Sequence, residues 1–309
     1  TWRTPNGAGS GLGGLDLHAA ICHSFATMAT GGFSTRNLSI ESYTSTYLHV
    51  VITCFMFLAG VNFALHFAAL RRGLRGYWRD TEFRVYLAVV LGAVLDVTLG
   101  LSWSSFDHLP DPAQRQAMAE RYGSVGTALR DGAFQVNTMI STTGFTTCDY
   151  ELWPFGLQFL LFCLMFMGGS TGSTGGGMKV MRWWLMAKHA YNELFLLVHP
   201  RAVKPLLYGR SVVSPGVMRS IWSFSLLFIG LFFAGSLAMA LLGLDPLSAM
   251  ASVVACLGNI GPALGSVGPH DNYAHLPLAG KWILTLCMLL GRLEVYTIII
   301  LFVPAFWRR

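Results

Sequence analysis

The stretch STTGFTT at Ser141–Thr147 sets the fold, because two more copies of this glycine-centred element flank it in the chain. The other copies read ATGGFST at Ala29–Thr35 and GNIGPAL at Gly258–Leu264. A short apolar segment precedes each copy and a longer one follows it. This order predicts a chain that dips into a membrane, turns at a glycine and leaves as a spanning helix. The turn glycines are Gly32, Gly144 and Gly261, which lie 112 and 117 residues apart.

The composition indicates a polytopic membrane protein. Hydrophobic residues make up 53% of the chain and charged residues only 12%, whereas a soluble domain carries about 25% charged residues. The net charge of +6 does not indicate nucleic-acid binding, because the basic residues lie in short loops between apolar stretches. The six cysteines form no CxxC pair and no cluster with histidine, so we expect neither a disulfide framework nor a zinc site.

Eight apolar stretches can be placed relative to a bilayer. Three hold only about 13–15 residues, which predicts re-entrant helices instead of crossings. Asp16 and Asp245 are the expected N-caps of the first and third of these, and Thr127 is the expected N-cap of the middle one. The short stretches are roughly 16–29, 127–141 and 246–258, and the five expected crossings are roughly 46–70, 83–102, 153–186, 217–243 and 277–307.

The basic residues predict the orientation. Five arginines fall within 71–84, five lysines and arginines within 187–219, and the chain ends in Arg308-Arg309. The positive-inside rule places these segments and the C-terminus in the cytoplasm, so the loops that carry the glycine elements face outside. These outer loops hold ten acidic and six basic residues. This balance is typical either of a vestibule that attracts cations or of ordinary solvated loops.

The glycine elements have the chemistry of an ion filter. A cation that crosses a bilayer must exchange its water shell for oxygens, and a ring of backbone carbonyls can provide them. Glycine permits the required backbone conformation, and the C-terminal end of each short helix adds about half a negative charge. The expected cation ligands are the carbonyls of Thr30, Gly31, Thr142, Thr143, Asn259 and Ile260. The expected filter also includes Gly32, Phe33, Gly144, Phe145, Gly261 and Pro262.

The crossing at 153–186 is interrupted by GGSTGSTGGGMK at Gly168–Lys179. As one helix it would reach about 51 Å, well beyond a core of about 30 Å, and six glycines disfavour a straight helix. We therefore predict an irregular polar loop beneath the filter that acts as a gate. A phosphate-binding loop is the competing interpretation, but Met178 occupies the lysine position. The predicted gating loop comprises Gly168, Gly169, Ser170, Thr171, Gly172, Ser173, Thr174, Gly175, Gly176 and Gly177.

Arg292 lies near the midpoint of the last expected crossing, in LLGRLEVYT at Leu289–Thr297. An arginine at mid-membrane costs about 2.5–3.5 kcal/mol, so it must face a cavity or a partner. On the pore axis its charge would oppose cation flow, and we favour this gating role. The alternative is a structural ion pair with Glu294 or another acid.

These motifs together resemble the Trk/Ktr/HKT superfamily of potassium transporters, and most closely the membrane subunits of bacterial Trk systems. The resemblance rests on Ala20–Thr35, STTGFTT, GGSTGSTGGGMK, LVHPRAV at Leu197–Val203, GNIGPALG and GRLE. It implies four helix–pore-loop–helix repeats around a pseudo-fourfold pore, with K+ as the transported ion and no covalent cofactor. It also implies a homodimer in the bacterial inner membrane, embedded in lipid, on a cytosolic TrkA-like ring of nucleotide-binding regulatory subunits.

A fourfold pore needs four glycine turns, and this chain has three. We therefore expect a further repeat and a helix, roughly 140 residues or more, before Thr1. Residues 1–82 are expected to form the second repeat without its first helix, 83–195 the third repeat and 196–309 the fourth.

The sequence thus predicts an all-α membrane protein that passes K+ through a gated pore and is not an enzyme. A cation symporter with alternating access, in which K+ is coupled to Na+ or H+, stays open as an alternative, although the repeats run parallel and are not inverted. An intramembrane enzyme is less favoured. Asp96 is alone in its span, and no serine–histidine pair lies at matched depth.

Overall fold

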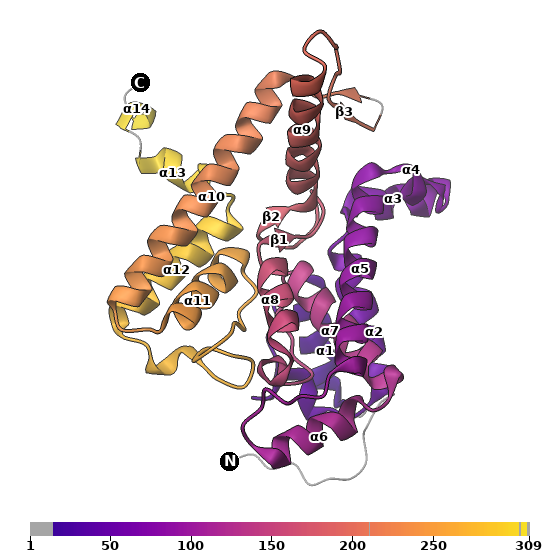
Figure 1. The fold of residues 1–309 in the computed structure, drawn as a ribbon, viewed down its shortest axis with the longest axis vertical. Helices are drawn as coiled ribbons and strands as arrows, with labels where there is room; N and C mark the ends of the chain where they lie inside the picture. Colours follow the sequence, from indigo (N-terminus) through magenta and orange to yellow (C-terminus); the bar gives the residue numbers. More distant parts are fainter. Residues whose placement is uncertain (1–14, 210, 303, 308–309) are drawn as a thin grey trace.

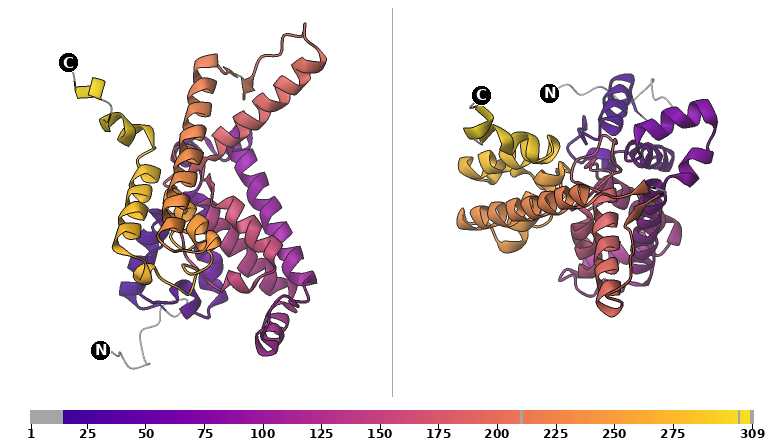
Figure 2. Two further views of the ribbon diagram at one scale, coloured as in Figure 1. Left: turned by 60° about the vertical axis from the view of Figure 1, so that its left-hand side comes forward. Right: turned by 90° about the horizontal axis from the view of Figure 1, so that it is seen from above.

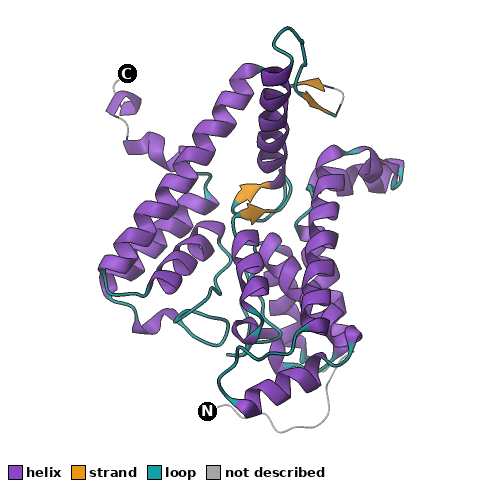
Figure 3. Cartoon of the chain, viewed as in Figure 1, coloured by secondary structure: helices purple, strands orange, loops and turns teal. Residues whose placement is uncertain are grey.

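The computed structural model describes residues 15–209, 211–302 and 304–307. Their regular elements are helices, apart from two short strand pairs, and loops connect them (Figures 1 and 3). The basic connections and the outer loops lie at opposite ends of the molecule. Helix α4, strand β3 and helix α14 lie towards one end in Figure 1, and helix α6 lies at the other. The expected all-α membrane architecture is confirmed.

The first segment contains a short helix and a bent pair. Helix α1 (Leu17–Met28) begins after Asp16, whose carboxylate accepts from the Ala19 N–H at 3.0 Å, as expected. The expected crossing at 46–70 is wrong as a single helix: α2 (Thr46–Ala59) and α3 (Phe63–Arg72) meet at 97°. The bend follows from local capping, because the Asn62 side chain accepts from the Ala64 N–H and starts a new helix. The segment also contains η1 (Ser39–Ser42) and α4 (Arg75–Arg79).

The middle segment holds the broken crossing. Helix α5 (Thr81–Trp103) is uninterrupted and is long and apolar enough to cross a bilayer, as expected. Helix α7 (Val125–Ile140) starts after Ser124, so the prediction of Thr127 as N-cap is wrong; Thr127 already lies in the first helical turn. The chain then breaks between α8 (Phe155–Leu164) and α9 (Val180–Val198). Two strands at the break, β1 (Met167–Gly168) and β2 (Met178–Lys179), pair in parallel. Helix α6 (Pro112–Tyr122) and η2 (Tyr150–Leu152) complete the segment.

The last segment departs from expectation at its end. Helix α10 (Pro215–Leu241) crosses without interruption, and α11 (Pro246–Gly258) begins after Asp245, which accepts from the Ser248 N–H at 3.0 Å. The expected crossing at 277–307 stops at Arg292, so Arg292 ends a helix and does not lie in the middle of one. The remaining elements are β3 (Leu207–Tyr208), β4 (Ser211–Val212), η3 (Tyr273–His275), α12 (Leu278–Arg292), α13 (Tyr296–Ile299), η4 (Ile300–Phe302) and α14 (Pro304–Trp307).

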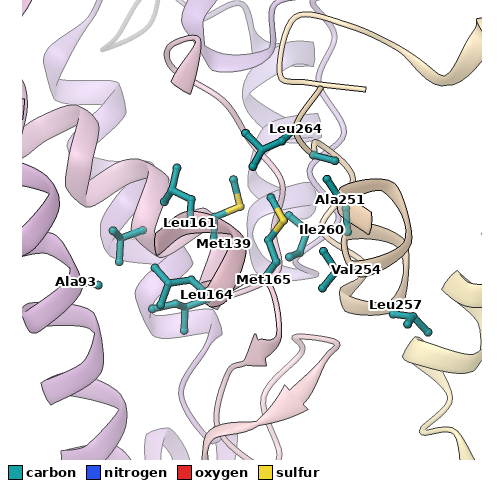
Figure 4. Packing of buried hydrophobic residues seen from close by; sticks show 14 of the residues in the cluster. Ala93, Met139, Leu161, Leu164, Met165, Ala251, Val254, Leu257, Ile260 and Leu264 are labelled. Atoms are coloured by element: carbon teal, nitrogen blue, oxygen red, sulfur yellow. The ribbon is translucent and has the colours of Figure 1, made fainter. Parts of the chain in front are cut away.

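Each short helix packs against the long helices of its own segment. Helix α1 lies against α2, and α11 contacts both α10 and α12 (Figures 1 and 2). Helix α7 lies against α5 and α8 and also contacts α2 of the first segment. The last two groups meet in one apolar core, where Met139, Leu161 and Met165 face Val254 and Ile260 (Figure 4). This burial of apolar surface fixes the ends of the short helices relative to one another.

Candidate functional site

The three glycine turns have one backbone conformation despite their different sequences. One or two residues past the end of each short helix stands a non-glycine residue with positive φ: 50° at Thr30, 58° at Thr142 and 57° at Asn259. The next N–H bonds back five residues, from Gly31 to Ala26 O at 2.8 Å, from Thr143 to Thr138 O at 2.9 Å and from Ile260 to Ala255 O at 2.8 Å. The shared glycines follow at φ 66°, 84° and 103°. This pattern is a left-handed helix cap that continues into a glycine turn.

The turns lie directly against one another. A Cβ atom added to Gly32 would lie 2.1 Å from the Thr143 carbonyl oxygen, and one added to Gly144 would lie 1.8 Å from that of Ile260. The third glycine, Gly261, has no atom of the described chain within 4 Å of such a Cβ. The three turns therefore follow one another in chain order, and the side beyond Gly261 is open.

The middle turn is more deeply buried than the first. The middle turn is enclosed: Thr142, Thr143 and Phe145 have no exposed surface. At the corresponding position of the first turn, Phe33 is 80% exposed. The expected filter residues are thus brought together, with the middle copy between the other two.

Side chains that the sequence did not indicate hold the third turn. The Tyr273 hydroxyl donates to the Gly261 carbonyl at 2.7 Å, and the buried Tyr150 hydroxyl donates to Ala263 O at 2.8 Å. Asn259, which the sequence did indicate, donates from Nδ2 to Met288 O at 3.1 Å. The tyrosines lie 12 and 113 residues from their acceptors, so no local motif could have revealed them.

The predicted gating loop lies at the C-terminal ends of the short helices. Thr174 O accepts from the Thr30 hydroxyl at 3.0 Å, and the Thr174 hydroxyl donates to Met28 O at 3.1 Å. The Gly176 N–H donates to the Thr142 hydroxyl at 2.7 Å. A Cβ atom on Gly176 would lie 2.5 Å from the carbonyl oxygen of Gly258, the last residue of α11. One loop thus touches all three pore-helix ends.

The first half of the loop is anchored to the segment around α3 and α4. The Ser170 N–H donates to Gly60 O at 2.8 Å, and the Phe63 N–H donates to Gly172 O at 3.1 Å. The carboxylate of Glu82, which is almost fully buried, accepts from the Thr171 N–H at 2.7 Å. No sequence pattern indicated Glu82, since an acid in the first turn of a helix is ordinary.

Arg292 and the loop line one cavity of about 300 Å³. The Arg292 guanidinium reaches across to the Ala29 carbonyl at 3.2 Å, at the end of α1. Glu294 pairs instead with Arg182, at 2.7 Å, and the Arg182 guanidinium stacks 3.8 Å from the centre of the Phe224 ring. Within the described residues Arg292 has no carboxylate partner. The ion pair between Arg292 and Glu294, which was the alternative to a gating role, therefore does not form. Lys179 turns its amino group back onto Gly175 O, inside its own loop.

Acidic side chains of the first two segments meet a histidine of the third at the ends of the turns. His270 lies 2.6 Å from a Glu41 oxygen and 3.7 Å from an Asp149 oxygen. Burial raises the pKa of the neighbouring Glu151 carboxyl to about 7, and Asp149 adds to this effect. Glu151 accepts from the Gly265 N–H and His270 lies nearby, and both partly oppose the rise. The outer loops are therefore joined by charged contacts just beyond the filter turns.

Comparisons with known proteins agree on one family. The family model TrkH, described as a cation transport protein, matches residues 4–309. The Trk system potassium uptake protein TrkH of Salmonella typhimurium is 41% identical over 296 residues, which cover 96% of this chain and 58% of that protein. The Trk system potassium uptake protein TrkG of Escherichia coli K12 is 33% identical over 298 residues, with the same coverage.

A solved structure extends the likeness to three dimensions. The crystal structure of the potassium transporter TrkH from Vibrio parahaemolyticus superposes with a TM-score of 0.83 at 36% identity. The match covers 94% of this chain and 59% of that one. The chain therefore spans somewhat more than half the length of the relatives that it matches, and the resemblance to the Trk superfamily is confirmed.

Proposed function

Because the chain belongs to the TrkH family of cation transport proteins, we propose that it forms part of the membrane subunit of a Trk-type potassium uptake system. Its relatives are named as potassium uptake proteins. The observation that carries the proposal is the contact between successive turns: Gly32 lies against the Thr143 carbonyl, and Gly144 against that of Ile260. Three turns of one conformation, each touching the next, are what a carbonyl-lined ion path requires.

The proposed K+ ligands are main-chain oxygens of the turns. They are the carbonyls of Thr30, Gly31, Thr142, Thr143, Asn259 and Ile260. Each pair follows the C-terminus of a short helix, where the helix dipole favours a cation. No covalent chemistry is assigned to the site, and K+ is the transported ion.

The proposed gate lies on the cytoplasmic side of these turns. Thr174 and Gly176 connect the loop at 168–177 to the helix ends, and Arg292 projects into the same cavity. A guanidinium there repels a cation that leaves the filter. Movement of the loop away from Thr30 and Thr142 would widen the path, and displacement of Arg292 would lower the electrostatic barrier.

The complete pore belongs to the longer protein. We assign 1–82, 83–195 and 196–309 to the second, third and fourth repeats, with a further glycine turn seated against the open side of Gly261. We also propose that the subunit lies in the bacterial inner membrane with its C-terminus in the cytoplasm. There it would form a homodimer on a TrkA-like nucleotide-binding ring, which would face the cytoplasmic segment that contains 199–206.

Ion flux tests this function. The full-length protein is purified and reconstituted into proteoliposomes, and K+ and Na+ fluxes are measured separately. We expect K+ flux that exceeds Na+ flux and that persists without a Na+ or proton gradient. Flux that requires such a gradient would support the symporter instead, and absence of K+ flux would overturn the proposal.

A further inference from the structure

The segment 63–79 forms a helical hairpin, here called the interface hairpin, that projects sideways from the helix bundle. Helix α3 leaves α2 at 97°, and α4 leads back to α5. Figure 1 shows both helices lying across the end of α5 and not along it. His66 secures the bend, because its ring nitrogens lie 2.6 Å from the Tyr77 hydroxyl and 2.9 Å from Leu58 O. If α2 and α5 cross the bilayer, α3 runs along its surface.

The chemistry of the hairpin is that of a helix at an anionic membrane surface. It contains four arginines and no acidic residue. Each arginine is exposed, and no carboxylate of the described chain pairs with any of them. Neither helix has a buried residue, and large apolar side chains share the exposed surface. The arginines are Arg71, Arg72, Arg75 and Arg79, and the exposed apolar residues include Phe67, Leu70, Leu74 and Trp78.

Exposed aromatic and aliphatic side chains beside unpaired arginines fit one kind of partner. The apolar groups enter the boundary between headgroups and acyl chains, and the guanidinium groups contact phosphates. An anionic leaflet attracts such basic segments, and the basic loops of this chain lie at the end assigned to the cytoplasm. Charge complementarity therefore favours anionic lipid over a neutral lipid surface.

Both ends of the interface hairpin bind the predicted gating loop. At its start, the Phe63 N–H donates to Gly172 O, and Gly60 O just before it accepts from the Ser170 N–H. Just after its end, Glu82 accepts from the Thr171 N–H. Three consecutive loop residues, Ser170 to Gly172, are thus hydrogen-bonded at the two ends of the hairpin, where the chain enters and leaves it. These contacts give a direct route by which a shift of the hairpin relative to the membrane surface reaches the loop.

We propose that the interface hairpin is a binding site for anionic phospholipid headgroups of the cytoplasmic leaflet, and that lipid bound there sets the position of the intramembrane loop. The regulatory half of this proposal rests on the function proposed above, whereas the binding half does not. Loss of anionic lipid frees the hairpin and changes ion flux without any change at the filter turns.

Lipid binding is measured first and does not depend on transport. Full-length protein in nanodiscs of phosphatidylcholine is titrated with a fluorescent phosphatidylglycerol, and energy transfer from the protein reports binding. Each basic residue near an anionic surface contributes a factor of about five in affinity, so replacing all four arginines by glutamine lowers affinity at least about 100-fold. Arginine-to-lysine replacement at the same positions keeps affinity within about tenfold. The control Arg36→Gln, at an exposed arginine outside the interface hairpin and outside the cytoplasmic basic segments, leaves it unchanged.

Two outcomes overturn the binding site. One is wild-type affinity in the four-glutamine variant, which would mean that another part of the longer protein or a regulatory subunit covers the hairpin. The other is equal binding of phosphatidylcholine and phosphatidylglycerol. Because the arginines are exposed and unpaired, the variants are expected to fold, and circular dichroism at the helical minimum verifies this.

Potassium flux then tests the regulatory half. Proteoliposomes with 0 to 40% phosphatidylglycerol, about the range over which surface charge becomes strong, are compared. Wild-type flux is expected to change severalfold across the series, and flux of the four-glutamine variant is expected to stay constant. Lipid binding without any lipid dependence of flux would overturn the regulatory half. Absence of K+ flux in every lipid would refute the proposed function and leave the binding result standing.

Discussion

Replacement of Gly144 by alanine is the sharpest perturbation of the proposed filter. The new Cβ atom would lie 1.8 Å from the Ile260 carbonyl oxygen, and contacts under 3.0 Å essentially never occur. The new Cβ atom and this oxygen must therefore separate by at least about 1.2 Å, the difference between these two distances. The positive φ of 84° adds about 1–2 kcal/mol of backbone strain. The turn at 258–264 and the turn at 141–147 are thus expected to be displaced relative to each other.

The displaced carbonyl is one of the proposed K+ ligands. A polar contact to a charged group is worth about 1.5–3 kcal/mol, so losing it lowers the K+ affinity of the filter about 10- to 100-fold. The preference for K+ over Na+ is expected to fall as well. The half-saturating K+ concentration and the flux ratio of the two ions, measured in proteoliposomes, report both effects.

The matched control is Gly92→Ala on α5. A Cβ atom there meets nothing within 4 Å, and the backbone is helical, so transport is expected to be unchanged. Gly32→Ala, with a clash of 2.1 Å against Thr143 O, is expected to resemble Gly144→Ala. Wild-type K+ affinity and ion preference in Gly144→Ala, at normal amounts in the membrane, would refute the assignment of these turns as the filter.

Three further predictions concern the gate and the outer loops. Arg292→Ala removes the cationic group from the cavity beneath the proposed filter and is expected to raise K+ flux. Arg292→Lys keeps the charge and is not expected to raise the flux. Reduced flux in the alanine variant at normal expression would favour a structural role. Deletion of 169–176 removes the contacts to Thr30 and Thr142 and is expected to leave a leaky pore. Flux is measured without any activating subunit. A folded variant that conducts no ions would contradict the assignment of this loop as the gate. Burial raises the pKa of Glu151 from 4.5 to about 7, so the native state holds the Glu151 proton more tightly than the unfolded state does. The stability that this proton provides is therefore lost as pH rises from about 4.5 through 7. Glu151→Gln is expected to flatten the melting temperature over this range, and an unchanged pH profile would count against the buried carboxyl.

The sequence predicted those features that repeat or that break a strong pattern. The three glycine turns, the helix starts at Asp16 and Asp245 and the interruption at 168–177 all follow from local rules on caps, glycine and span length. The membrane class followed from composition alone. Such signals lie within a few residues of the feature that they specify, which is why they can be read without a structure.

The bends at the end of the molecule that carries the basic connections were missed, because the apolar content of a segment does not reveal the direction in which it runs. The stretches 46–70 and 277–307 are long enough to cross, yet one turns by 97° after Gly60 and the other stops at Arg292. In the first, Asn62 caps a new helix, and its neighbours Gly60 and Phe63 bond to the distant loop. These tertiary contacts override the hydrophobic length of the segment.

The long-range hydrogen bonds and ion pair that hold the site together could not be predicted from the sequence either. Tyr150 and Tyr273 donate to carbonyls of the third turn, and Glu82 binds Thr171 across 89 positions. The pairing of Glu294 with Arg182 joins two residues separated by 112 positions. None of these residues is unusual in its local context, so only the packing of the short helices brings each one to its partner.

The most direct measurement is the location of the ion itself. Crystals of the full-length protein grown with Rb+ in place of K+ give an anomalous signal that marks each bound ion. The account predicts a peak among the glycine turns, within coordinating distance of carbonyls of Thr142 and Thr143 and of their counterparts in the other repeats. A fully conducting protein whose peaks lie away from these carbonyls, or whose turns hold only hydrated ions, would contradict it.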